Sequence, residues 1–100
     1  MTRILLIEDE EPIRRVLIRI LSEESASYEI IQAEDGREGI SKLSKSTFDL
    51  VLCDIKMPKM DGIEVLQAAK LNGIHIPFIM LTGLSLIHIS EPTRLRRISY

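Results

Sequence analysis

The sequence lacks a second cysteine, a long apolar run and an excess of positive charge, and each absence excludes a class of protein. Cys53 alone cannot form an internal disulfide, which suits a reducing cytosol. No apolar run approaches the length of a membrane span, and the acids from Glu8 to Glu11 interrupt the apolar start, so we expect neither a signal peptide nor a membrane anchor. Residues 1–83 hold ten basic and fourteen acidic side chains, a net charge of −4, which argues against direct nucleic-acid binding.

Alternating apolar runs and helix-period stretches indicate a single small α/β domain. The chain has 100 residues, and 45% of them are hydrophobic, which is enough for one packed core. Apolar runs predict strands over 3–7, 28–33, 50–53 and 76–81. Helical spacing predicts helices from 11 to a loop at 25–27, from about 36 to 45, and over 62–71. This alternation is typical of right-handed βαβ units and a parallel sheet, in which Pro77 is tolerable only near a strand start or on an edge.

The spacing within the first two helices predicts which side chains face the core. The first helix should bury one apolar stripe, made of Ile13, Val16, Leu17, Ile20 and Leu21. Its charged side chains should face water, namely Arg14, Arg15, Arg19 and Glu23. The second helix should bury Ile40 and Leu43, and Asp35 should cap it with Glu38 as the capping-box partner.

Three acids and a hydroxyl follow three of the predicted strands. Glu8 and Asp9 come directly after the first strand, Asp54 after the third and Thr82 after the fourth. The carboxyl ends of parallel strands share one edge of an open sheet, and ligands bind at that edge. Clustered carboxylates repel one another, and a hard divalent cation with oxygen ligands, Mg²⁺ above all, relieves the repulsion.

Three stretches resemble the receiver domains of bacterial two-component response regulators. They read I-L-L-I-E-D-E-E-P at 4–12, L-V-L-C-D-I-K-M-P-K-M-D-G at 50–62 and P-F-I-M-L-T-G at 77–83, and the resemblance covers 2–83. The middle stretch is highly specific, because it combines Asp54, Pro58 and Asp61-Gly62 at fixed spacing after an apolar strand. The resemblance implies the flavodoxin-like, doubly wound receiver fold, with a parallel sheet in the order 2-1-3-4-5 and the site where strands one and three separate.

The resemblance also implies a role for each of these residues. Asp54 would accept a phosphoryl group from a sensor histidine kinase or phosphotransfer protein, and Thr82 would contact the phosphoryl oxygens and move as a switch. Mg²⁺ would be bound by Asp9, Asp54 and the backbone carbonyl of Lys56, while Glu8 would hold a metal-bound water. Such a domain is a cytoplasmic signalling module that catalyses only its own phosphorylation and dephosphorylation.

Two alternative functions belong to other classes. A Mg²⁺-dependent phosphatase with an aspartyl-phosphate intermediate needs a second aspartate two residues after the nucleophile as general acid, and Lys56 stands at that position. A receiver-like interaction module that is never phosphorylated usually loses the acidic pair or the acceptor, whereas Glu8, Asp9 and Asp54 are all present. Cys53 is expected to be a small buried hydrophobe rather than a reactive thiol.

The residues after Gly83 depart from the family pattern. The family has a fourth helix, a fifth strand ending in Lys-Pro and a fifth helix, but residues 84–100 contain no lysine. Residues 84–89 match the translation of CTG-TCT-CTT-ATA-CAC-ATC, the end of a transposon-based sequencing-library adapter, and 90–100 continue that adapter in frame. We therefore expect a truncated receiver domain at 1–83, a non-native or disordered tail at 84–100, and an output domain missing from this chain.

This departure predicts physical consequences. The fourth strand would become a sheet edge, and the first helix would lose the neighbour that covers part of its apolar stripe. Residues 84–86 alternate enough to lie against the core as a strand. Without the lysine, phosphorylation of Asp54 should be slow, and its relay to the surface should be weak.

Overall fold

Strands and helices alternate along the chain, as the sequence predicts. The computed structural model describes residues 1–82 and 85–88, with Thr82 and residues 85–88 described by their backbone alone. Three helices connect the first four strands. In chain order the elements are β1 (Thr2–Ile7), α1 (Glu11–Glu24), β2 (Tyr28–Ala33), α2 (Gly36–Lys45), β3 (Leu50–Asp54), α3 (Gly62–Leu71), β4 (Phe78–Thr82) and β5 (Ser85–His88).

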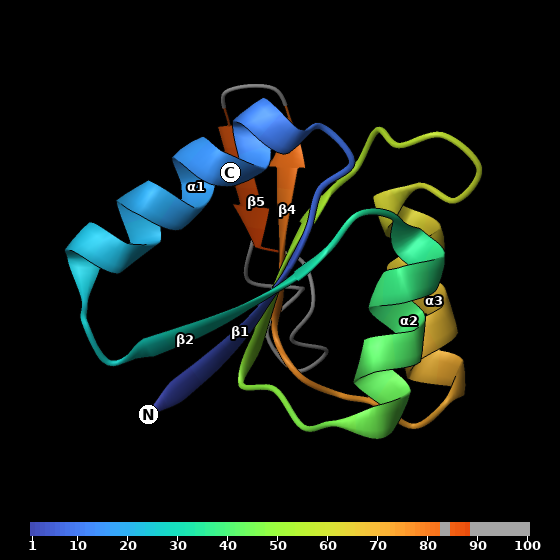
Figure 1. Cartoon of the computed structure of the whole chain (residues 1–100). Coiled ribbons are helices and arrows are strands. Elements are labelled where there is room, and N and C mark those ends of the chain that lie inside the picture. Colours follow the sequence, from blue (N-terminus) through green and yellow to red (C-terminus); the bar gives the residue numbers. More distant parts are fainter. Residues whose placement is uncertain (83–84, 89–100) are drawn as a thin grey trace.

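The strands form one sheet in the order β2-β1-β3-β4-β5, with α1 on one face and α2 and α3 on the other (Figure 1). The first four strands are parallel, which confirms the predicted doubly wound arrangement. Alternate residues of β1 supply two cores. Leu5 and Ile7 pack with α2 and α3, whereas Ile4 and Leu6 pack with α1. Strands covered on both faces read as continuous apolar runs, as β1 does. Within the described residues, no helix is long and apolar enough to cross a membrane.

The strand register brings the polar strand ends to one edge. Cys53 of β3 lies opposite Ile7 of β1 and Met80 of β4, so all three strands reach the same height. Asp54 lies opposite Leu81. Glu8 follows Ile7 directly, and it is therefore level with Asp54 at the carboxyl edge of the sheet, where parallel folds bind their ligands.

Most predicted boundaries are confirmed, and the exception is β4. The predicted strand began at 76, whereas β4 begins at Phe78. Pro77 has no N–H to contribute to a ladder, but its carbonyl accepts a hydrogen bond from Val51 N at 2.9 Å. The proline therefore lies just outside the strand, as its chemistry requires.

The predicted core face of α1 is partly wrong. Arg14, expected in water, is buried, and the half-buried residues on its side of the helix are Leu17, Ile18 and Leu21. The other members of the predicted apolar stripe are exposed, with exposed fractions of 42%, 57% and 55% for Ile13, Val16 and Ile20. The helix is rotated so that Arg14 rather than Ile13 meets the sheet. The expectation that part of this stripe is left uncovered is confirmed.

The N-terminal caps of α2 and α3 differ in whether the capping box is complete. Asp35 caps α2, as predicted, by accepting a hydrogen bond from Glu38 N, but the Glu38 carboxylate accepts from Glu34 N instead of closing the box on Asp35. A complete capping box occurs in α3, where Asp61 and Glu64 bond each other's main-chain N–H groups. The box fixes the first turn of α3 directly after the loop that follows Asp54.

The expectation that β4 is a sheet edge is wrong, whereas the expectations that the family's parallel fifth strand is missing from the described residues and that the start of the tail lies against the sheet as a strand are confirmed. Residues 85–88 form β5, which pairs antiparallel with β4 and places Ser85 opposite Thr82. A tight return of the chain permits only this antiparallel pairing, since a parallel strand needs a long crossover. In the described part of the chain, no parallel fifth strand and no helix follow β4. The other tail residues expected to be irregular, 84 and 89–100, lie outside the described residues.

The same substitution should have a small effect on the exposed face of α1 and a large effect on the face that meets the sheet. Val16→Lys adds a charge at an exposed position and should change the free energy of unfolding by less than about 0.5 kcal/mol. Ile18→Lys places the same charge in the core beneath α1 and should cost about 2 kcal/mol. Urea denaturation of both variants measures the difference. Equal losses would show that Val16 is covered.

Candidate functional site

Acidic side chains gather at the carboxyl edge of the sheet. Glu8 and Asp9 lie between β1 and α1, and Asp54 is the last residue of β3. One carboxylate oxygen from each of Glu8, Asp9 and Glu10 lies within 4.8 Å of the others. Glu10 was not singled out in the sequence, although the acidic run from Glu8 to Glu11 could have indicated it. Glu8, Asp9 and Asp54 lie close enough together, as predicted, for the charges of Asp9 and Asp54 to contribute to the raised pKa of Glu8.

Glu8 is a buried acid that holds its proton unusually tightly. Its exposed fraction is 2%. Burial and, to a lesser degree, the negative charges of Asp54 and Asp9 raise the pKa of Glu8 to about 7, against the opposing effect of a hydrogen bond from Glu10 N. Nearby positive charge is the simplest way to release this proton. Glu8 therefore favours a cation at this edge of the sheet.

Asp9 carries a buried oxygen without a partner. Its Oδ1 atom makes no hydrogen bond, and no other buried side-chain nitrogen or oxygen among the described residues is in this state. An unpaired buried oxygen is costly unless water or an ion binds it. Carboxylate oxygens are the ligands that Mg²⁺ and Ca²⁺ prefer. The residues present therefore fit a hard divalent cation.

Asp54 is half-buried and remains accessible at the sheet edge. Lys56 N donates a hydrogen bond to Asp54 Oδ1 at 3.3 Å. Burial raises the pKa of the Asp54 carboxyl, the charge of Asp9 raises it further, and the Lys56 N–H opposes both. A carboxylate in this position can act as a metal ligand or as a nucleophile.

The loop after Asp54 folds back against the strand that precedes it. Gly62 N donates to Ile55 O at 2.8 Å, and a Cβ atom at Gly62 would lie 2.5 Å from Asp54 O. Only glycine permits this approach. Lys59 has φ of 72° and lies between Pro58 O and Met60 N, which are 2.7 Å apart. This is a γ-turn of the strained hand, and it tightens the loop.

For Lys56 and Thr82, the other two predicted site residues, the structure gives the position in the fold but not the predicted contact. Lys56 is exposed, two residues beyond Asp54, and its carbonyl as a metal ligand stays a prediction. Thr82 is the last residue of β4 and follows Leu81, the partner of Asp54 in the register, so its backbone reaches the expected edge. Its contact with a phosphoryl group stays a prediction as well.

The cysteine of the site region has a structural role. Cys53 is a free, fully buried thiol between β1 and β4. Burial, together with the charges of Asp54 and Glu8, raises its pKa to about 12. The reactive form of cysteine is the thiolate, so Cys53 behaves as the small buried hydrophobe that was expected.

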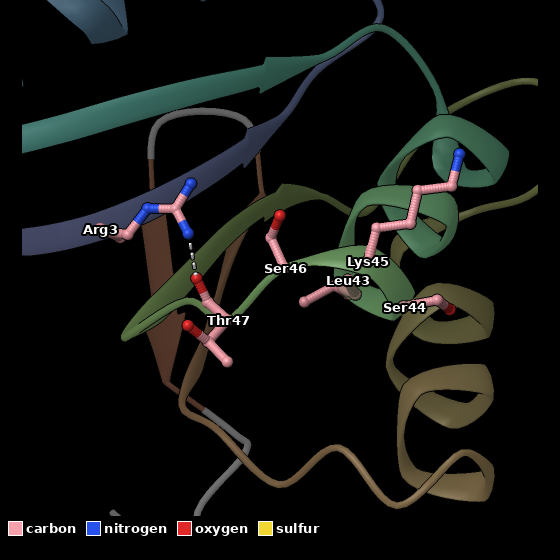
Figure 2. A pocket seen from close by; sticks show the side chains of 6 residues that line it. All are labelled: Arg3, Leu43, Ser44, Lys45, Ser46 and Thr47. Atoms are coloured by element: carbon pink, nitrogen blue, oxygen red, sulfur yellow. Dashed lines mark hydrogen bonds between the residues drawn. The ribbon is translucent and has the colours of Figure 1, made fainter.

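A pocket of about 510 Å³ lies away from the acids, near the amino ends of β1 and β3 (Figure 2). Arg3 borders it, with Nη1 donating to Thr47 O at 2.7 Å and Nε donating to Glu29 Oε1 at 3.2 Å. The guanidinium also lies 4.9 Å from the centre of the Phe48 ring. These contacts join β1, β2 and the loop before β3, so we assign Arg3 a structural role.

Comparison with known proteins finds a matching family model and relatives that cover most of the chain. The family model described as response regulator receiver domain matches residues 4–92. The transcriptional regulatory protein ResD of Bacillus subtilis (strain 168) is 43% identical over 82 residues, which are 82% of this chain and 33% of ResD. The response regulator receiver protein CpdR of Brucella abortus (strain 2308) is 34% identical over 90 residues, which are 90% of this chain and 73% of CpdR. The chain thus spans about a third of the length of relatives such as ResD.

Solved structures share the fold. The response regulator protein TrrA from Thermotoga maritima, in complex with Mg²⁺-BeF, superposes with a TM-score of 0.77 and 40% identity, over 85% of this chain and 72% of TrrA. TrrA in complex with the histidine kinase ThkA gives a TM-score of 0.75, with the same identity and coverage.

Gly62→Ala should displace the loop around Asp54. The added Cβ would lie 2.5 Å from Asp54 O and 2.9 Å from Ile55 Cα, both backbone atoms that cannot rotate away, so we expect a loss of about 2 kcal/mol in the free energy of unfolding. Gly73→Ala is the matched control, because Gly73 has φ of 78° and no atoms nearby. It should lose about 1 kcal/mol. Two-dimensional NMR should show shifted amides at residues 54–56 only for Gly62→Ala. Undisturbed amides there would contradict the proposed close packing.

The metal-free protein should lose stability as the pH rises toward neutrality. Because the folded pKa of Glu8 is raised from 4.5 to about 7, its contribution is complete below 4.5 and disappears as the pH passes about 7. Urea denaturation in a chelator should show a fall of about 2 kcal/mol over this window. Glu8→Gln keeps the shape and the acceptor without the titration, so it should flatten this part of the curve. The same fall in both proteins would assign the effect to other groups.

Proposed function

The chain belongs to the response regulator receiver domain family, and we propose on this basis that Asp54 accepts a phosphoryl group from the phosphohistidine of a histidine kinase. The main support is the place of Asp54. It ends the central strand β3, half-buried, beside a second acid that holds an unpaired buried oxygen. A nucleophilic carboxylate next to a cation site is what phosphoryl transfer requires.

Mg²⁺ is the cation that this proposal assigns to the site. Asp9, Asp54 and the Lys56 carbonyl would hold it, with Glu8 holding one of its waters. The unpaired Oδ1 of Asp9 and the raised pKa of Glu8 support this assignment. The TrrA complex with Mg²⁺-BeF supports it by similarity. Bound Mg²⁺ would offset the negative charge on the phosphoryl oxygens.

The residues of the chain would perform the transfer as follows. Lys56 N–H holds Oδ1 of Asp54, which leaves Oδ2 to attack the phosphorus. The new O–P bond forms as the P–N bond to the kinase histidine breaks, and the bonding pair returns to the imidazole. The product is an acyl phosphate on Asp54. The hydroxyl of Thr82 would bond a phosphoryl oxygen and move toward it, which biases the surface of the domain between two states.

The proposal extends to partners and setting. A sensor histidine kinase or phosphotransfer protein supplies the phosphoryl group, supported by the complex of TrrA with ThkA. Catalysis is limited to gain and loss of that group on Asp54. The domain itself binds no nucleic acid and acts in the cytoplasm. It passes its signal to an output domain, a proposal that fits its match to only a third of the length of ResD. The receiver unit covers 1–83, and 84–100 is a non-native tail.

The two alternative functions have less support. Lys56 occupies the position of the general acid in an aspartyl-phosphate phosphatase, and its exposed side chain cannot donate a proton as a carboxylic acid does. An interaction module that is never phosphorylated would have no need of the buried, unpaired oxygen of Asp9.

Phosphorylation by a small acyl phosphate donor tests the proposal. In Mg²⁺, the protein should gain one phosphoryl group slowly, measured by intact mass, and chelation of the metal should prevent the gain. Asp54→Asn should abolish it. Asp49→Asn is the control, because Asp49 lies at the other end of β3, where it accepts a hydrogen bond from Arg3 N. Phosphorylation that survives Asp54→Asn would refute the assignment.

A further inference from the structure

A buried arginine beside the acids has no role in the chemistry above. Arg14, in the first turn of α1, is 8% exposed. Its Nη1 donates to Glu8 O at 2.7 Å, and its Nε donates to Gln32 Oε1 at 2.9 Å. Among the described residues, no carboxylate lies within salt-bridge distance of Arg14. A buried guanidinium is costly, and here two neutral acceptors hold it in place, one on Glu8 directly after β1 and one on Gln32 of β2.

The contacts of Arg14 enclose Asp9 from both sides. On the N-terminal side, its guanidinium holds Glu8 O, the carbonyl of the Glu8–Asp9 peptide. On the C-terminal side, its main-chain N–H donates to Glu10 O at 3.0 Å. Glu8 N donates to Ala33 O at 3.1 Å, and Glu10 N donates to the Glu8 carboxylate. The segment from Glu8 to Glu10 is therefore fixed at four points, two of them on Arg14.

We propose that Arg14 is a positioning residue for the cation site. Its guanidinium fixes the peptide between Glu8 and Asp9 and so orients both carboxylates toward the cation. This inference rests on the proposed function, because it assigns Arg14 to the same site. Groups that orient metal ligands from behind contribute about 10- to 100-fold to metal affinity.

Two possible roles of Arg14, as a positive charge and as a hydrogen-bond donor, predict opposite changes in Mg²⁺ affinity when Arg14 is replaced. A positive charge repels Mg²⁺, so its removal would strengthen metal binding if charge were the only effect of Arg14. Loss of the hydrogen bond to Glu8 O frees the peptide before Asp9, so it would weaken metal binding. The sign of the change therefore separates positioning from electrostatics.

The test is a calorimetric titration of Mg²⁺ into the wild-type protein and three variants. Arg14→Met keeps an extended side chain and should raise the Kd about tenfold. Arg15→Met removes the same charge from the next residue, whose side chain is 78% exposed and pairs with Glu11, and it should leave the Kd within about twofold. Arg14→Lys keeps the charge but cannot reach Glu8 O and Gln32 together, so it should recover only part of the loss.

Equal or tighter Mg²⁺ binding by folded Arg14→Met would overturn the inference. Wild-type protein that binds no Mg²⁺ would refute the cation site of the proposed function instead. Amide hydrogen exchange without metal still tests Arg14 in that case. Arg14→Met, but not Arg15→Met, should lose protection at the amides of Glu8 and Glu10, and unchanged protection would overturn the positioning role.

A second variant covers the case in which Arg14→Met fails to fold. Gln32→Leu removes the acceptor of Arg14 Nε and leaves the charge in place. It should weaken Mg²⁺ binding about threefold, since the guanidinium loses one of the two acceptors that hold it. Unchanged binding in this variant would overturn the inference as well.

Discussion

Repulsion among carboxylates at one sheet edge is the constraint on which the rest of the structure depends. The parallel register of β1 and β3 places Glu8 level with Asp54, and Asp9 follows directly. Burial and this mutual charge raise the pKa of Glu8 to about 7. Without a cation this arrangement is unfavourable, and the proposed Mg²⁺ would relieve it. Electrostatically preorganised sites of this kind are common in phosphoryl transfer.

Three local features keep the acids together despite their repulsion. The close approach of Gly62 to Asp54 O folds the loop back over β3. The capping box of Asp61 and Glu64 anchors the far end of that loop on α3. On the other side, the buried guanidinium of Arg14 holds the carbonyl of Glu8. None of these three features uses a carboxylate oxygen of Glu8, Asp9 or Asp54.

The parts of the fold that depend on local pattern could be predicted from the sequence. The apolar runs gave strands whose ends carry the expected acids, and α3 has its predicted bounds of Gly62–Leu71. The burial of Arg14 could not be predicted, because helical spacing treats a charge as solvated. Its acceptors, on Glu8 after β1 and on Gln32 of β2, come close to it only after folding. The same holds for the Glu38 carboxylate, which bonds Glu34 N rather than Asp35 N. The antiparallel pairing of β5 depends on a chain reversal that periodicity does not encode.

Mg²⁺ bound at these acids should displace the proton of Glu8, so a count of the protons released on binding tests the cation site most directly. Calorimetric titration of Mg²⁺ in buffers of different ionisation enthalpy counts the protons that leave the protein on binding. Near pH 7, where Glu8 is about half protonated, we expect one Mg²⁺ to bind with release of about half a proton. Glu8→Gln should bind without this release. Absence of Mg²⁺ binding, or binding by wild-type protein with no proton released, would contradict the account.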